Sequence, residues 1–175
     1  ITKVVVDKNT NRILGAQVLG PGDVSKQVTT WAMAIQAKMT VEDMLNLDLP
    51  YAPPYSLAID HSIATAHIMQ NKLDGLFVGI TPTELKAKLE RKDPMFLMDL
   101  RNPGEFEVMK IGIGEKLFPQ WEFRDRWDEL PKDKNAEIIA WCKISLRGYE
   151  AVRALMQYGY KNVKLLEGGV LGWPW

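Results

Sequence analysis

The sequence predicts an α/β fold with a central parallel sheet flanked by helices, preceded by a smaller α+β unit. In the second part of the chain, short apolar runs alternate with helical patterns, which is typical of parallel strands covered on both faces. In the first part, two β-rich runs are followed only by helical patterns. Asp74-Gly75 lies between the two parts. We therefore expect domains at residues 1–74 and 75–175.

The first domain is predicted to contain one hairpin and three helices. The expected strands are Lys3–Asp7 and Ile13–Leu19, and the expected helices cover 24–35, a short stretch after Thr40, and about 58–70. A polar turn with two Asn residues suits the hairpin. Asp23 is placed to cap the first helix, and Thr40 with Asp43 three residues later resembles a capping box at the second.

The second domain is predicted to alternate helices with buried strands. The expected order is helix 82–91, strand 95–100, helix 122–130, strand 137–141, helix 148–158 and strand 163–166. Thr81, Pro82 and Glu84 provide a helix cap, a proline at the first helical position and the carboxylate of a capping box. Gly159 is placed to end the helix before the last strand.

Composition excludes several classes of function. The 175 residues carry 22 basic and 22 acidic side chains, and neither part has the positive excess of a nucleic-acid or anionic-membrane binder. No apolar run approaches the ~20 residues of a membrane-spanning helix. We therefore expect no nucleic-acid and no membrane partner. The chain begins at Ile1 without a Met, which is typical of a piece of a longer protein.

Cysteine and histidine usage is sparse. A single cysteine excludes an internal disulfide and indicates a reducing compartment, so a cytoplasmic location is expected. With one Cys and two His, the sequence contains no metal-ligand cluster, and we expect no metal.

Cys142 has the position of a functional thiol. It follows the strand 137–141 and precedes the helix near Gly148, and ligands gather at the carboxyl ends of parallel strands. A thiol that faces a helix N-terminus between Lys143 and Arg147 is expected to favour the thiolate, in a loop suited to an anion. The alternative is a buried structural thiol. Arg147 favours the functional interpretation, because a guanidinium pointing into a core would be costly.

Several motifs of the second domain occur together. They are Asp99-Leu100-Arg101, Pro103-Gly104-Glu105-Phe106, the Cys142–Arg147 loop, Tyr160-Lys161-Asn162-Val163, Glu167-Gly168-Gly169 and Gly172-Trp173. With this set, residues from about 79 to 175 resemble a rhodanese domain, which implies a sulfurtransferase. The resemblance implies that a Cys142 thiolate attacks a sulfane-sulfur donor and passes the persulfide sulfur to a thiol acceptor. It also implies that Arg147 closes a loop whose N–H groups cradle the persulfide, those of Lys143, Ile144, Ser145, Leu146 and Gly148.

Loop length and composition refine this resemblance. Related phosphatases have five residues between Cys and Arg, whereas this loop has four, so sulfur transfer is favoured and a phosphatase is the lesser alternative. Bulky Ile144 and Leu146 favour a larger or more apolar substrate than thiosulfate. Relatives often have a Gly-His-Ile-Pro-Gly run where this chain has residues 109–114. Asp99 and Arg101 are interpreted as a structural pair that holds the turn after the strand.

Motifs in the first domain resemble a second family. They are Ile13-Leu14-Gly15-Ala16-Gln17, Thr40-Val41-Glu42-Asp43-Met44, Leu49-Pro50-Tyr51-Ala52-Pro53-Pro54-Tyr55-Ser56 and Asp60. Residues 2–73 resemble part of the dimerisation domain of pyridine nucleotide-disulfide oxidoreductases of the coenzyme A disulfide reductase and NADH oxidase type. The resemblance implies a homodimer through residues 1–74, in which Tyr51 or Tyr55 reaches the partner subunit's flavin-proximal cysteine. The alternative is that both tyrosines simply pack beside prolines in a turn.

Together the two resemblances imply the C-terminal part of a flavoprotein disulfide reductase with a fused rhodanese domain. FAD, NAD(P)H and coenzyme A are then expected in the full-length parent, with coenzyme A disulfide, coenzyme A persulfide or polysulfide as substrate. This chain has no Gly-x-Gly-x-x-Gly fingerprint, so no cofactor is expected in it. Two alternatives stay open: a catalytically silent interaction module, and a scaffold that acts mainly through dimerisation.

Overall fold

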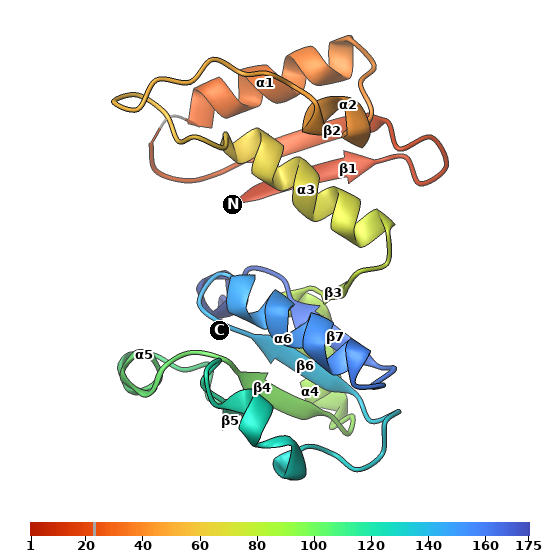
Figure 1. The fold of residues 1–175 in the computed structure, drawn as a ribbon, viewed down its shortest axis with the longest axis vertical. Helices are drawn as coiled ribbons and strands as arrows, with labels where there is room; N and C mark the ends of the chain where they lie inside the picture. Colours follow the sequence, from red (N-terminus) through yellow and green to blue (C-terminus); the bar gives the residue numbers. More distant parts are fainter. Residues whose placement is uncertain (23) are drawn as a thin grey trace. The chain divides into compact units, whose positions relative to one another are not determined.

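The computed structural model describes residues 1–22 and 24–175, so the predicted helix cap Asp23 lies outside the described residues. The chain forms two compact units, Ile1–Gly75 and Leu76–Trp175 (Figure 1). Each has its own buried core. Among the described residues, none of the helices combines the length and the apolarity needed to cross a membrane.

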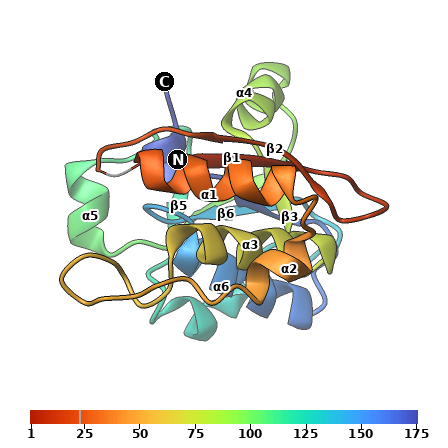
Figure 2. The ribbon, with the colours of Figure 1, turned by 90° about the horizontal axis from the view of Figure 1, so that it is seen from above.

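Where the structure describes it, the first unit contains a hairpin and three helices. Strands β1 (Thr2–Val6) and β2 (Ile13–Val18) pair antiparallel, and the helices are α1 (Val24–Gln36), α2 (Val41–Leu45) and α3 (His61–Leu73). Helix α1 runs along the hairpin and buries Trp31 against it (Figure 2). The predicted capping box at Thr40 is confirmed, with Asp43 Oδ2 accepting from the Thr40 N–H at 2.8 Å. Helix α3 begins later than predicted, because the Asp60 side chain caps it through the Ser62 N–H.

The second unit contains the predicted parallel sheet. Its strands are ordered β3-β7-β6-β4-β5, and their bounds are β3 Val78–Ile80, β4 Phe96–Asp99, β5 Lys116–Leu117, β6 Ile138–Trp141 and β7 Val163–Leu166. Alternate residues of β6 face opposite sides, as the pleat requires. Ile138 and Ala140 pack with helix α6 (Leu146–Gln157), whereas Ile139 and Trp141 pack with helix α4 (Pro82–Arg91). The two helices therefore cover opposite faces (Figure 1).

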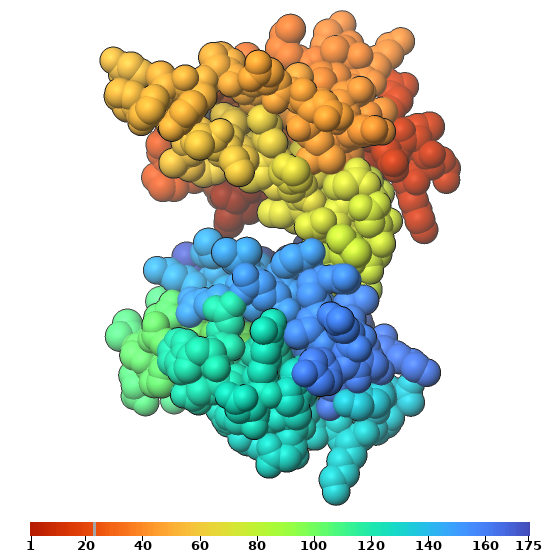
Figure 3. All heavy atoms as spheres, viewed as in Figure 1, coloured from red at the N-terminus to blue at the C-terminus, as the bar shows by residue number. Residues whose placement is uncertain are grey.

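The predicted helix Glu122–Leu130 is wrong. Two 3₁₀ turns replace it, η1 (Phe123–Asp125) and η2 (Trp127–Glu129). The reason is tertiary, because Phe123 is buried in the core and Trp127 stacks on Tyr158 of the segment that ends α6. Figure 3 shows this segment lying against α6. Burying Phe123 and packing Trp127 against Tyr158 outweigh the helical preference of so short a stretch.

Four short elements were not predicted: β3, the two-residue strand β5, helix α5 (Pro103–Val108) and the 3₁₀ turn η3 (Gly169–Gly172). Helix α5 contains Gly104 in its first turn, a residue that lowers helix propensity. An Asn102–Glu105 capping box nevertheless starts it. Helix α6 begins at Leu146 instead of Gly148, and this places its N-terminus closer to Cys142.

Candidate active site

Cys142 lies at the carboxyl end of β6, at the start of the loop that enters α6. Its side chain is 1% exposed, and its Sγ accepts the Ser145 N–H at 3.3 Å. Ser145 has a φ of 101°, a left-handed conformation that is uncommon for a residue with a side chain. Its hydroxyl donates to the Leu166 carbonyl of β7 at 3.1 Å. This bond holds the loop curled around the sulfur.

The N-terminus of α6 is pressed against the end of β6. A Cβ at Gly148 would lie 2.9 Å from the Trp141 Cα, so only glycine allows this approach. The first N–H groups of an α-helix have no intrahelical partner, and they carry a partial positive charge. Because Cys142 directly follows Trp141, these groups lie beside the thiol's own strand end, an arrangement that favours an anion.

A second segment fixes the backbone of the loop. The Val170 N–H donates to the Cys142 carbonyl at 3.0 Å, and the Leu171 N–H donates to the Lys143 carbonyl at 3.2 Å. Gly169 has a φ of +56°, and a Cβ there would lie 2.3 Å from the Cys142 oxygen. The Glu167-Gly168-Gly169 motif therefore holds the outer side of the Cys142 loop.

Arg147 forms a bidentate ion pair with Glu105 of α5. Nη1 and Nη2 donate to the two carboxylate oxygens at 2.7 and 2.8 Å. These hydrogen bonds raise the pKa of Arg147 above its ordinary value, and the charge of Cys142 adds to the effect. An anion was predicted opposite Arg147, but Glu105 was not among the predicted site residues. The signal was present in the three-residue spacing of Asn102 and Glu105 at a helix start.

Glu105 is itself held in place by a buried ion pair. Asp99 and Arg101 are 0% and 2% exposed, and Arg101 Nη2 donates to Asp99 Oδ2 at 2.7 Å. Arg101 Nη1 donates to the Glu105 carbonyl at 3.1 Å, while Asn102 and Glu105 exchange the two bonds of the capping box. The end of β4 is thus connected to Arg147 through a continuous set of ion pairs and hydrogen bonds.

Both parts of the chain match protein families over most of their length. Residues 81–174 match the rhodanese-like domain, and residues 1–63 match the dimerisation domain of pyridine nucleotide-disulphide oxidoreductases. The chain belongs to the rhodanese-like family. The predicted combination of a rhodanese-like domain with this dimerisation domain is confirmed.

Three similar proteins act on sulfur according to their names. A solved structure of an NAD-dependent persulfide reductase from A. fulgidus is 41% identical, with a TM-score of 0.85, over 98% of this chain and 30% of that one. An NAD(P)H coenzyme A polysulfide/persulfide reductase from Pyrococcus horikoshii is 40% identical over 39% of this chain and 15% of its own length. A sulfurtransferase from Allochromatium vinosum is 32% identical over 54% of this chain and 85% of its own length. The chain spans less than a third of either reductase, and the family supports a sulfur-related function.

The rhodanese-like domain exposes apolar side chains beside its Cys142 loop. Ile144 and Leu146 are each 66% exposed, and Lys143 is exposed as well, whereas Ser145 is half-buried and Gly148 is buried. Other exposed apolar side chains lie on the connections that follow β4 and β5. They are Val108, Met109 and Trp121. The Gln120 amide donates to Glu150 of α6, and this bond joins the connection after β5 to the helix that starts at the loop.

Tyr51 and Tyr55 belong to the other unit and are not part of this loop. They are 53% and 89% exposed. The backbone around them is turned by the Tyr55 and Ser56 N–H groups, which both donate to the Ala52 carbonyl. The proline-rich stretch is therefore a turn that presents both phenol rings outward.

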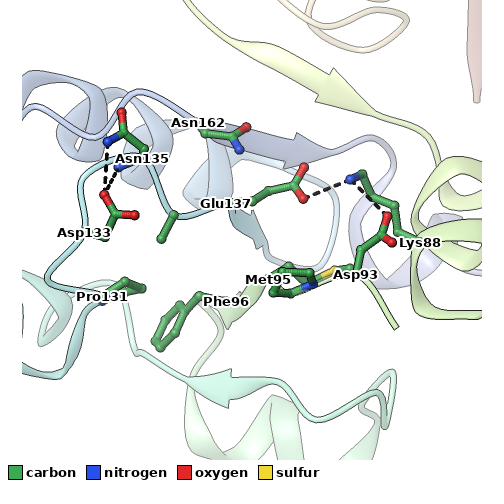
Figure 4. A pocket seen from close by; sticks show the side chains of 11 residues that line it. Lys88, Asp93, Met95, Phe96, Pro131, Asp133, Asn135, Glu137 and Asn162 are labelled. Atoms are coloured by element: carbon green, nitrogen blue, oxygen red, sulfur yellow. Dashed lines mark hydrogen bonds and ion pairs between the residues drawn. The ribbon is translucent and has the colours of Figure 1, made fainter. Parts of the chain in front are cut away.

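A hollow in the rhodanese-like domain lies at the opposite end of β6 from Cys142. It encloses about 660 Å³ beside Met95, Phe96 and Asn162 (Figure 4). Burial raises the pKa of Glu137 there, but hydrogen bonds from Lys164 (2.5 Å) and Lys88 (3.0 Å) outweigh burial and lower it overall. These charged groups pair with one another, so the hollow contains an ion-pair network.

The ion pair with Arg147 predicts an acid-dependent contribution to stability. Hydrogen bonds from Arg147 lower the pKa of Glu105 from 4.5 to about 2. A lowered folded-state pKa stabilises above the unfolded value, and the contribution is lost as the pH falls from 4.5 toward 2. We expect Glu105→Gln to lower the free energy of unfolding by about 1–2 kcal/mol at pH 7 and to shrink this difference at pH 2–3.

Denaturant unfolding at several pH values measures this effect. Glu107→Gln removes a carboxylate from the exposed side of the same helix and serves as the control. If Glu105→Gln lowered the free energy of unfolding by the same amount from pH 7 to pH 2, the expectation would be contradicted.

Proposed function

We propose that the rhodanese-like domain transfers sulfur through a persulfide on Cys142. The proposal rests on the position of the Cys142 Sγ, which accepts the Ser145 N–H at the point where β6 meets the N-terminus of α6. Backbone N–H groups and a helix N-terminus stabilise an anion more than a neutral thiol. A persulfide anion needs that stabilisation throughout the reaction.

The transfer has two balanced steps. The Cys142 thiolate attacks the outer sulfur of a donor R–S–S⁻, the donor S–S bond breaks, and R–S⁻ leaves while Cys142–S–S⁻ forms. An acceptor thiolate R′–S⁻ then attacks the outer sulfur of Cys142–S–S⁻, which releases R′–S–S⁻ and restores the Cys142 thiolate. Each step needs only a thiolate nucleophile and a thiolate leaving group. The N–H groups of residues 143–148 are proposed to cradle the persulfide.

We further propose that the chain is the C-terminal part of a flavin-dependent reductase for coenzyme A disulfide, coenzyme A persulfide or polysulfide. The names of the reductases that it resembles support this assignment. The parent would then bind FAD, NAD(P)H and coenzyme A outside this chain. It would form a homodimer through residues 1–74 in the cytoplasm, with Tyr51 or Tyr55 at the partner subunit's flavin. The outward tyrosines fit a contact with another subunit better than a packed turn.

A second candidate function is a silent interaction module. The observation in its favour is the burial of Cys142, which is 1% exposed. In that case the donor would have no access to the sulfur.

Intact-mass measurement separates the two candidates. We expect the chain to gain the mass of one sulfur atom on exposure to thiosulfate or coenzyme A persulfide, and to lose it on addition of a thiol or cyanide. Cys142→Ala is expected to gain none, because the chain has no other cysteine. Ser25→Ala, on α1 of the first unit, serves as a control that should gain sulfur as the unsubstituted chain does. No mass gain with either donor would establish the silent module.

A further inference from the structure

Arg147 commits its charge and two of its five N–H groups to Glu105. Nη1 and Nη2 are both bonded to Glu105, at 2.7 and 2.8 Å, in the side-by-side geometry that a guanidinium offers to a planar anion. The side chains of Arg147 and Glu105 are each about a quarter exposed. A ligand at the loop would therefore contact the pair as one neutral unit. The loop therefore binds anions mainly through its backbone N–H groups and the end of α6.

Glu105 is not free to swing away from Arg147. Its Oε2 also accepts the Asn102 N–H at 3.1 Å, and its carbonyl is tied to the buried Arg101. An anion that needed the edge formed by Nη1 and Nη2 would have to displace a carboxylate held by its own helix. That carboxylate would then lose its partner and repel the incoming charge.

We propose that Glu105 selects the charge of the sulfur donor. By pairing the positive charge of Arg147 and taking the edge formed by Nη1 and Nη2, it makes the loop favour a singly charged organic persulfide over doubly charged thiosulfate. The inference rests on the proposed persulfide chemistry at Cys142. Glu105 acts through Arg147 and is therefore a positioning residue.

The two donors differ in what they need from the loop. Thiosulfate delivers its outer sulfur with release of sulfite, so two negative charges must be stabilised as the S–S bond breaks. An organic persulfide releases a thiolate with one charge. A free guanidinium fork matches the oxyanion of the first donor, whereas backbone N–H groups suffice for the second.

Glu105→Gln tests the assignment. The amide is nearly the same size and keeps an oxygen for the Asn102 N–H, but it is neutral and bonds Arg147 less strongly. We expect the kcat/KM ratio of thiosulfate to hydroxyethyl persulfide to rise roughly tenfold to a hundredfold, the size of one hydrogen bond to a charged group. The rise should come mainly from a lower KM for thiosulfate. Sulfur gain on Cys142, followed by mass, provides the rates.

Two further variants keep the result interpretable. Glu107→Gln removes an exposed charge from the same helix and should leave the donor ratio unchanged. Glu105→Asp keeps the charge on a shorter side chain. We expect its donor ratio to lie between the ratios of the unsubstituted chain and of Glu105→Gln. Glu105→Asp also replaces Glu105→Gln if that variant does not fold.

Each outcome decides the proposal. An equal fall in kcat/KM for both donors would assign Glu105 a structural role and overturn the proposal. A preference of the unsubstituted chain for thiosulfate would overturn it too. If the unsubstituted chain gains sulfur and Glu105→Gln leaves the kcat/KM ratio of the two donors unchanged, only this inference fails. If the unsubstituted chain gains sulfur from neither donor, both this inference and the proposed function fail.

Discussion

Asp99→Ala is expected to destabilise the second unit by about 3–5 kcal/mol, the cost of leaving a buried charge unpaired. Arg101 is 2% exposed, and three of its side-chain hydrogen bonds end on Asp99. Without that carboxylate, the guanidinium has neither water nor a counterion. Denaturant unfolding followed by tryptophan fluorescence measures the loss, since five of the six tryptophans lie in this unit.

A surface ion pair provides the matched control for Asp99. Glu90 pairs with Lys86 on α4 at 3.9 Å, with both side chains well exposed, and Glu90→Ala should change stability by less than about 0.5 kcal/mol. The double variant Asp99→Leu with Arg101→Met removes both charges and is expected to recover part of the loss. A single Asp99→Ala variant as stable as Glu90→Ala would contradict the assignment of the pair as structural.

Gly169→Ala is the second substitution with a large expected effect. Its Cβ would lie 2.3 Å from the Cys142 oxygen and 2.7 Å from the Lys143 oxygen, both of them backbone atoms that cannot turn aside. The 168–172 segment would have to move off the Cys142 loop and break the bonds from Val170 and Leu171. We expect a loss of about 2–5 kcal/mol and a strongly reduced rate of sulfur gain on Cys142.

A substitution at Gly159 distinguishes the steric clash of an added Cβ from the backbone strain of a positive φ. Gly159 also has a positive φ, +89°, but a Cβ there would meet nothing within 4 Å. Gly159→Ala should therefore cost only the strain of about 1–2 kcal/mol and leave sulfur gain unchanged. If Gly169→Ala behaved no worse than Gly159→Ala, the contact between the 168–172 segment and the Cys142 loop would not matter.

These experiments also connect the fold to the proposed chemistry. Asp99 and Arg101 hold α5, α5 presents Glu105, and Glu105 orients Arg147 beside the Cys142 loop. Gly169 holds the same loop from the other side. Loss of the Asp99 pair should thus affect the donor ratio through Glu105, whereas loss of Gly169 should slow both donors alike.

Features that depend on a few neighbouring residues could be predicted from the sequence alone. The capping boxes at Thr40 and Thr81, the helix Pro82–Arg91 and the strand Val163–Leu166 follow from local patterns and are confirmed. The same is true of the position of Cys142 between a buried strand and a helix. Short-range spacing encodes these features, because capping and periodic burial act within one or two turns of chain.

The partner of Arg147, in contrast, depends on how the strands are arranged in space. Glu105 lies 42 residues earlier in the chain, and the two meet because β4 and β6 are parallel neighbours whose carboxyl ends coincide. The 3₁₀ turns at 123–129 likewise depend on Tyr158, which no local pattern connects to Trp127. Contacts of this range are set by strand order and register, and a single sequence specifies those through the energy of the whole core.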